Sequence, residues 1–312
     1  MMLDALINIK KAISTLNPHQ IREMSEQPVR VALHAQGQEA YQRMENFFLQ
    51  DLAPARRRQS ALQLVRAPIP VLGQGFDLAV YDEDTPAPHG ALIFRPAHPR
   101  PMIHHALSEY PKLSIGLAKS FLPFRHPFVE RVIAKTCREN TFFSIATALP
   151  DVIPNVIELP WAVAEFASDT AFLTMNQVRM AFLIAAASDR EVGYRQQKSE
   201  VATVIGSAFG WRALARQLVG KIPFGGGLLA KAAIAYAGTK VLGLSLDRFY
   251  SIGFTYTREE RDRLYMDAFR QGKKVAIKIV TQFRPELAAK FNVETGNGAG
   301  TAAAVKARAA SY

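Results

Sequence analysis

Apolar residues with two different spacings divide the chain into a mixed front part and a long helical part. Strand-like runs occur at residues 28–35, 76–82 and 90–96, and a helical pattern from Gln38 to Leu52 separates the first two. Strand–helix–strand order predicts a small α/β sheet with parallel members. From Leu113 onward the spacing is helical. We therefore expect an α+β chain in which a small sheet domain precedes a larger all-α bundle.

The helical pattern is clearest between residues 201 and 250, where two apolar runs are joined by the breaker 222–227 (IPFGGG). Gly206 and Gly210 form a GxxxG step, which lets two helix backbones approach closely. Proline and glycine then stop the first helix. The pattern predicts a Gly/Ala-rich helical hairpin with small residues at its seam. We assign it a helix-packing motif that consists of Asn176, Gln177, Gly206, Gly210, Pro223 and Gly225.

Residues 161–187 form a second apolar stretch that is long enough to span a bilayer. Apolar positions cover nearly its whole circumference, which is typical of a helix buried in a bundle or in lipid. Glu165, Asp169 and Arg179 argue against a lone span, because a charge at the bilayer centre costs roughly 2.5–3.5 kcal/mol. An integral membrane protein that inserts helices 161–187 and 201–247 stays an alternative.

The two ends of the chain have simpler patterns. Residues 1–27 predict an amphipathic helix that breaks at Asn17-Pro18 and packs on the body, with a lipid anchor as the less favoured interpretation. Thr257 and Glu260 form a capping box, and Gly272 predicts a later helix break. The expected domains are the helix 1–27, the α/β domain 28–111, the helical domain 112–291 and a disordered tail 292–312.

Basic charge is concentrated in the last third of the chain. The formal net charge is +11, to which residues 201–312 contribute +10. An anionic membrane face fits this charge better than nucleic acid does, because neither an aromatic-basic sheet motif nor a helix-turn-helix is present. Arg212 and Arg216 lie one helical turn apart and are the candidate anion or partner contact, with a solvated stripe as the equal alternative. We expect a cytoplasmic protein, without a signal peptide, that can meet the inner membrane face.

The front part has the layout of a nucleotide-binding core but lacks the residues that bind phosphate. Residues 34–40 read HAQGQEA, and the chain contains no GxxxxGK[ST] motif. Such a loop needs glycines for its backbone N–H groups and a lysine for the β/γ-phosphate charge. We interpret residues 82–84 as a solvated acidic turn rather than as a metal site. The sequence thus predicts a degenerate P-loop-like domain that needs no cofactor, with an unorthodox phosphate loop at 36–39 as the alternative.

Histidine and cysteine provide no recognisable catalytic or metal motif. Five of the seven histidines lie between His89 and His126, around a proline-rich segment, 85–111, which we interpret as a crossover between domains. His104 and His105 are adjacent and therefore point to different sides, which disfavours zinc. The single cysteine, Cys137, lies on an apolar stripe, so we expect a buried structural thiol and no disulfide within the chain.

Four segments between residues 150 and 250 follow one another in a distinctive order, and these are 173–177 (LTMNQ), 209–218, 222–226 and 235–239. With these segments, residues 150–250 resemble a bacterial family of unknown function, the YcjF-like helical domain that occurs C-terminal to GTPase domains and in inner-membrane proteins. The resemblance implies a helical module that is associated with a GTPase or a membrane, without catalytic residues. Together with the charge pattern, it predicts a non-enzymatic, membrane-peripheral scaffold or regulatory partner of a GTPase.

Overall fold

The computed structural model describes residues 2–67, 75–148, 169–206 and 226–283. The described chain is mostly helical and contains a small parallel sheet, so the α+β class is confirmed at this level. Two compact units are present. The sheet unit comprises Pro18–Val132 and Phe182–Gln196, and the helical unit comprises Met1–Asn17, Ile133–Ala181 and Gln197–Tyr312. The units alternate along the chain, whereas the sequence pattern suggested consecutive domains.

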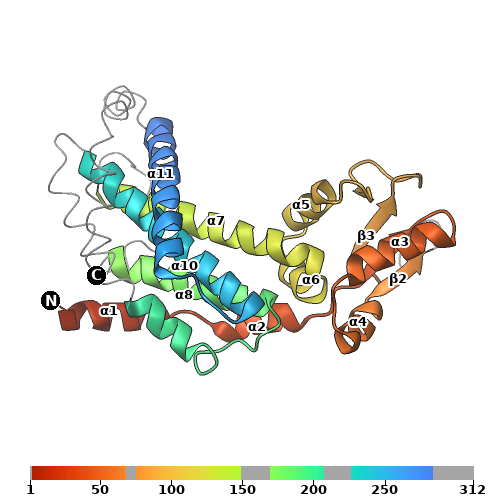
Figure 1. The fold of residues 1–312 in the computed structure, drawn as a ribbon, viewed down its shortest axis with the longest axis horizontal. Coiled ribbons are helices and arrows are strands. Elements are labelled where there is room, and N and C mark those ends of the chain that lie inside the picture. The colour runs from red at the N-terminus through yellow and green to blue at the C-terminus, as the bar shows by residue number, and fades with distance from the viewer. Residues whose placement is uncertain (1, 68–74, 149–168, 207–225, 284–312) are drawn as a thin grey trace. The chain divides into compact units, whose positions relative to one another are not determined.

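The sheet contains four parallel strands in the order β2-β1-β3-β4, of which Figure 1 labels β2 and β3. All four residues of β1 are buried, as expected for a central strand that is covered on both faces. The three sequence-predicted strands are confirmed, but β2 was missed, because its pattern is short and contains the exposed Arg66. The strands are β1 (Val31–His34), β2 (Leu64–Ala67), β3 (Leu78–Asp82) and β4 (Leu92–Phe94).

Helices cover this sheet and fill its core with aromatic rings. Phe48 of α3 is fully buried, and its ring lies 5.1 Å from that of Phe121 and 5.7 Å from that of Phe124. These helices are α2 (Pro18–Glu26), α3 (Gln38–Leu49), α4 (Pro54–Ala61), α5 (Arg100–Glu109), α6 (Ser114–Ser120) and the first part of α7 (Leu122–Ala146).

The interpretation of residues 85–111 as a loop-rich crossover was wrong in its second half. Helix α5 occupies ten of these residues, with Pro99 at its N-cap and Pro101 in its first turn. Proline is tolerated there because the first backbone N–H groups of a helix have no partner inside the helix. The same prolines therefore start a helix where the sequence pattern suggested a loop.

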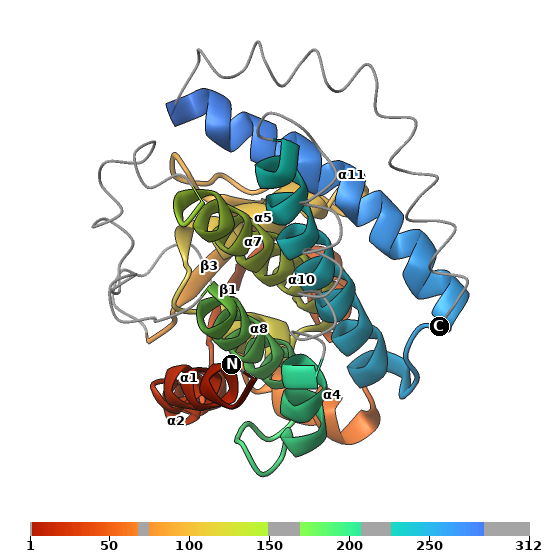
Figure 2. The ribbon, with the colours of Figure 1, turned by 90° about the vertical axis from the view of Figure 1, so that its left-hand side faces the viewer.

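The helical unit is built around α10 (Gly226–Ile252) and the part of α8 (Asp169–Ala187) that ends at Ala181. Helix α11 (Arg258–Phe283) lies along α10, as Figures 1 and 2 show, and Ala233, Ala237 and Val241 of α10 pack with Tyr265 and Ala268 of α11. The unit also contains α1 (Met2–Ser14), the second part of α7 and a helix over residues 198–206.

The predicted helix break at Gly272 was wrong. Helix α11 continues through this residue, which packs tightly against α10. A Cβ atom on Gly272 would lie 2.8 Å from the Cβ of Tyr236 and 3.0 Å from both the Cα and the carbonyl oxygen of Ala233. The glycine is therefore needed for close approach of two helix backbones. A second close approach occurs at Gly243 of α10, where a Cβ would lie 2.7 Å from Ile133 Cγ1.

The N-terminal segment forms two helices, and the predicted break at Asn17-Pro18 is confirmed because α1 ends at Ser14 and α2 begins at Pro18. Ile9, Ala12 and Ile13 of α1 are buried. Thr15, just beyond α1, places its hydroxyl 3.7 Å from the sulfur of Met175 in α8. Helix α1 thus packs on the body of the helical unit.

Among the described residues, two helices are long and apolar enough to cross a membrane, judged by length and composition alone. The apolar windows are Thr170–Ala187 in α8 and Gly227–Ile252 in α10, and 83% of the first and 72% of the second is buried inside the protein. Buried core helices of a soluble protein meet the same criterion.

Candidate functional site

The carboxyl edge of the sheet is the place where a ligand would bind in a parallel α/β fold. The chain passes from β1 to β2 on one side and then to β3 on the other, so the strand order reverses between β1 and β3. Parallel sheets bind ligands in the crevice outside this switch point. His34 ends β1, and Tyr81 and Asp82 end β3.

Aromatic side chains pack together at this position. The imidazole of His34 stacks on the ring of Tyr81, with 4.4 Å between ring centroids and 10° between planes, and Phe76 contacts it edge-on at 6.4 Å. His34 is only 2% exposed, and among the described residues its Nε2 has no hydrogen-bond partner. Burial lowers the pKa of His34, so the ring is neutral near pH 7 and supplies no positive charge to a phosphate.

The loop after β1 contains one glycine and neither lysine nor arginine. Gly37 has a φ of 88° and stands at the N-cap of α3, which no described side chain caps. The nearest cation with a described contact to this turn is Arg66 of β2, which donates to Gln38 at 2.9 Å. Its guanidinium also makes two hydrogen bonds to Glu45, at 2.5 and 2.7 Å. This charge is therefore already neutralised.

The end of β3 adds negative charge to the same edge. Asp82 is 1% exposed and lies 3.8 Å from Arg43, while its Oδ1 lacks a hydrogen-bond partner in the described chain. The pair with Arg43 compensates the charge of this carboxylate, so the end of β3 provides no excess of positive charge for a phosphate. Glu83 and Asp84 are exposed, as expected for a solvated turn, but the prediction was wrong for Asp82, which is buried as the last residue of β3. No group of three or more potential metal ligands exists in the described ranges.

The helical unit contains a buried chain of polar side chains that joins α7, α8 and α10. Asn176 donates to Asn140 at 3.0 Å, and Asn140 donates to Thr239 at 2.9 Å. Gln177 donates to the same Thr239 hydroxyl oxygen at 3.0 Å. All four side chains are buried among apolar neighbours. In such surroundings each hydrogen bond fixes how the three helices pair, because a shifted register would leave amide groups without partners.

Glu139 of α7 lies at one end of this polar chain. Its carboxylate accepts a hydrogen bond from Asn176 at 3.4 Å and lies 3.9 Å from the ammonium group of Lys135. Burial raises the pKa of Glu139, and the positive charges of Lys135 and Arg179 oppose that rise. The polar chain thus ends at the partly exposed carboxylate of Glu139. None of its described side chains is a thiol, an amine or another nucleophile that could carry a reaction.

The structure locates only some of the sequence-predicted residues. Asn176 and Gln177 lie in the polar chain that joins three helices. A Cβ on Gly206 would meet no described atom within 4 Å. The remaining predicted contacts lie outside the described residues, and these are Gly210, Arg212, Arg216, Pro223 and Gly225.

Cys137 is fully buried in α7, and its thiol lies 3.6 Å from the carbonyl oxygen of Tyr236, to which it donates. Burial raises the pKa of the thiol to about 12. Because the thiolate is the reactive form, we expect iodoacetamide to label native protein at pH 8 about a thousandfold more slowly than the urea-unfolded chain. Mass spectrometry of quenched samples measures both rates, and fast labelling of the folded chain would contradict the buried position.

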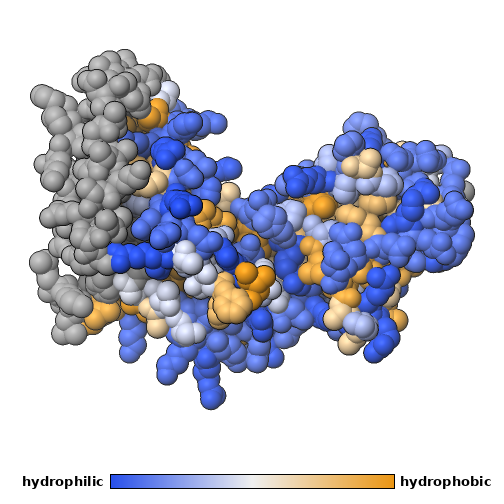
Figure 3. Space-filling model, in the orientation of Figure 1, coloured by the Kyte–Doolittle hydropathy of each residue, from blue (hydrophilic) through white to orange (hydrophobic). Residues whose placement is uncertain are grey.

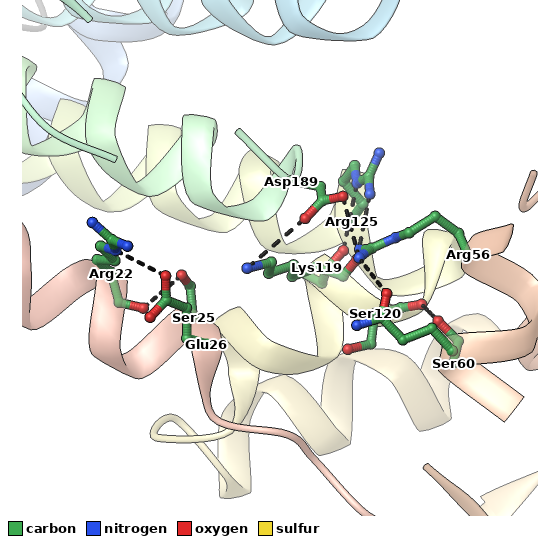
Figure 4. Close-up of polar contacts among 11 residues, drawn as sticks. Arg22, Ser25, Glu26, Arg56, Ser60, Lys119, Ser120, Arg125 and Asp189 are labelled. Atoms are coloured by element: carbon green, nitrogen blue, oxygen red, sulfur yellow. Dashed lines mark hydrogen bonds and ion pairs between the residues drawn. The ribbon is translucent and has the colours of Figure 1, made fainter. Parts of the chain in front are cut away.

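An ion-pair cluster ties the segment after α8 to the rest of the sheet unit (Figure 4). Asp189 lies 3.2 Å from Arg56 and 3.8 Å from Lys119. Arg56 also donates to the carbonyl oxygen of Lys119 at 2.9 Å. The cluster thus connects the end of α8 with α4 and α6, and the carboxylate of Asp189 pairs with both cations.

The backbone at Asp189 has a conformation that usually requires glycine. Its φ is 57°, and the N–H of Arg190 donates to Ala185 while that of Asp189 donates to Ala186. These bonds form a Schellman cap, in which the left-handed residue is most often glycine. The carboxylate contacts of Asp189 account for an aspartate here, because glycine could not pair with Arg56. No motif in the sequence indicated this cluster.

Sequence reasoning also missed a surface on α11. The side chains of Arg263, Arg270, Lys274 and Lys278 are exposed along one side of this helix. Figure 3 shows hydrophilic residues over the face of α11 that is turned to the viewer. The overall basic charge of the last third was a signal for such a surface, but the sequence alone suggested Arg212 and Arg216 as its position.

Comparison with protein families, with curated proteins and with solved structures gives no match, so no family is assigned to this chain.

Proposed function

We propose that this protein is a non-enzymatic, membrane-peripheral scaffold or regulatory partner of a GTPase. Its sheet unit acts as a degenerate P-loop-like domain, with the strand layout of a nucleotide-binding fold but without a phosphate site. The observation that carries the proposal is the set of side chains at the β1–β3 switch point. There the buried His34 at the end of β1 stacks on Tyr81 of β3, and Tyr81 is followed by the buried Asp82.

Three physical requirements of phosphate binding argue for this proposal. A phosphate loop needs several free backbone N–H groups, and Gly37 is the only glycine of the turn. It needs a cation, whereas Arg66 is paired with Glu45. It also needs a surplus of positive charge, whereas the buried carboxylate of Asp82 at the same edge is paired with Arg43. A sheet that no longer binds nucleotide still offers a rigid surface to another protein.

A nucleotide-binding protein with a non-standard phosphate loop is the second candidate. The positive φ of Gly37 and the absence of a described side-chain cap on α3 favour it. A helix N-terminus attracts anions through its free N–H groups and its dipole. Neither feature supplies a cation for a triphosphate.

Isothermal titration calorimetry with GTP and with ATP, each with Mg²⁺, separates the two candidates. We expect no heat beyond dilution at millimolar nucleotide. A saturable heat that disappears in Gly37→Val would overturn the scaffold proposal and support the second candidate, because valine cannot easily adopt the backbone conformation of Gly37.

The GTPase half of the proposal has its own test. The immobilised full chain is incubated with cell extract that contains either a non-hydrolysable GTP analogue or GDP. We expect nucleotide-dependent capture of a protein that carries an intact GxxxxGK[ST] loop. Capture that ignores the nucleotide, or that yields no such protein, would contradict a role as GTPase partner.

A further inference from the structure

Helix α11 has one face that packs on α10 and one that is exposed to solvent. Its buried residues recur at helical spacing, so the opposite side is free of described neighbours over four turns. The buried positions are Tyr265, Ala268, Phe269, Gly272, Ala276 and Val280.

The exposed side of α11 is strongly basic. Between Arg263 and Lys278 the sequence has five lysines or arginines and one acidic residue, Asp267. That aspartate is paired with Arg270 at 3.4 Å. Lys274 and Lys278 are exposed and lie one helical turn apart, so their charges point to the same side. We call the exposed side chains of Arg263, Arg270, Lys274 and Lys278 the basic face.

Large apolar side chains are exposed at the turn that leads into α11. Gly253, with a φ of 80°, ends α10 through a hydrogen bond from its N–H to the carbonyl oxygen of Phe249. The side chains of Ile252 and Phe254 on either side of it are 57% and 73% exposed. Figure 3 shows an apolar group at the corresponding end of α10. We call Phe249, Ile252 and Phe254 the apolar tip.

Polar contacts hold this turn in place. Thr257 and Glu260 bond each other through backbone N–H groups at 2.8 and 3.3 Å, which confirms the predicted capping box. Glu260 also pairs with Arg248 at 3.2 Å, and Arg248 lies over the ring of Tyr256 at 4.5 Å. The hydrogen bond from Thr257 and the charge of Arg248 lower the pKa of Glu260, so these contacts persist at neutral pH. The apolar tip is therefore presented by an ordered turn.

We propose that the basic face and the apolar tip together form the surface through which this protein docks on an anionic phospholipid bilayer. The inference rests on the proposed peripheral function and names its surface. Cations gain binding energy near anionic lipid, and exposed Phe and Ile side chains insert at the boundary between headgroups and acyl chains. Nucleic acid would account for the basic face but not for the apolar tip, because it offers no apolar site into which Ile252 could insert. The ring of Phe269, next to Lys273, is buried and cannot stack on a base.

Charge reversal on the basic face tests the proposal. The double variant Lys274→Glu/Lys278→Glu is compared with Arg58→Glu/Arg100→Glu, which reverses two exposed cations of the sheet unit. Full-length proteins are sedimented at low salt with vesicles of phosphatidylcholine containing 30 mol% phosphatidylglycerol, or of phosphatidylcholine alone. We expect the α11 variant to bind the anionic vesicles at least tenfold more weakly than wild type, and the sheet-unit variant to bind within about twofold of wild type.

A second variant separates the apolar tip from the charges. Ile252→Ser/Phe254→Ser changes exposed side chains, so circular dichroism should show an unchanged fold. Salt screens the contribution of the cations but not apolar insertion. We therefore expect the affinity of this variant for anionic vesicles to be within about threefold of wild type at low salt. At 0.5 M salt we expect its affinity to be at least tenfold lower than that of wild type.

The outcomes distinguish failure of the inference from failure of the proposed function. If wild-type protein binds neither vesicle type, the membrane half of the proposed function fails. If wild type binds anionic vesicles and the α11 variant binds equally well, only the inference fails. If the α11 variant keeps vesicle binding but loses binding to duplex DNA or RNA in fluorescence anisotropy, the basic face is a nucleic-acid surface and the inference is overturned.

Discussion

Gly272→Ala should lower the free energy of unfolding of the helical unit by about 2–3 kcal/mol, because not even a Cβ atom fits between α10 and α11 at this position. The atoms that a Cβ would meet include the Cα and carbonyl oxygen of Ala233, at 3.0 Å each. Backbone atoms inside a helix cannot move aside individually, so the two helices would have to separate. Urea unfolding followed by circular dichroism measures the loss, and hydrogen exchange in α10 assigns it to this unit.

Two other glycines are matched controls for this result. Gly243→Ala should cost less, about 1 kcal/mol, because the nearest atoms belong to the side chains of Ile133 and Met180, which can change rotamer, and not to the backbone. Gly206→Ala should be neutral or stabilise by up to about 1 kcal/mol, since no described atom lies within 4 Å. Equal losses for all three variants would contradict close packing at Gly272.

Thr239→Val should destabilise the helical unit by about 2–4 kcal/mol although it changes neither size nor shape. The hydroxyl oxygen of Thr239 accepts hydrogen bonds from both Asn140 and Gln177. Valine would leave two buried amide donors without an acceptor, and each such donor costs about 1–3 kcal/mol. The shift in the urea midpoint, at unchanged slope, measures the effect.

Thr141→Val is the matched control, because Thr141 is equally buried but bonds only within its own helix. Its hydroxyl donates to the carbonyl oxygen of Cys137 at 2.7 Å, four residues earlier. Losing this local bond leaves no amide unpaired, so we expect a cost below about 1 kcal/mol. A Thr141 variant as damaging as Thr239→Val would show that the polar chain adds nothing beyond ordinary packing.

The same polar chain bears on the two apolar helices. Asn176 and Gln177 of α8 and Thr239 of α10 satisfy one another only when α7, α8 and α10 are packed together. If α8 and α10 entered lipid separately, their amides would lose these partners in surroundings without water. Peripheral attachment through α11 leaves α7, α8 and α10 packed together, so the hydrogen bonds of the polar chain stay intact.

Sequence reasoning predicted the elements that have strong periodicity. The three longer strand patterns, α3 and the capping box before α11 follow from local residue spacing, which depends on few neighbours. The sequence also identified Asn176 and Gln177 as packing residues but could not indicate their partners. Thr239 lies more than 60 residues away, and only the packed bundle brings the three side chains together.

The errors come from residues whose role depends on tertiary contacts. Gly272 suggested a break, because glycine has a low helix propensity, yet the gain from packing on α10 outweighs that cost. Prolines before α5 suggested a loop, yet they occupy the first turn of a helix. Asp189 carries no signal at all, since its left-handed backbone is stabilised by Arg56 and Lys119 from distant elements.

Hydrogen exchange of the full chain in detergent-free buffer, with and without anionic vesicles, tests most directly whether α8 and α10 are core helices of a folded bundle. We expect slow exchange in α8 and α10 under both conditions, because both helices form the core of a bundle that meets the membrane only from outside. Fast exchange of these helices in buffer, followed by strong protection when vesicles are added, would contradict it and identify them as membrane spans.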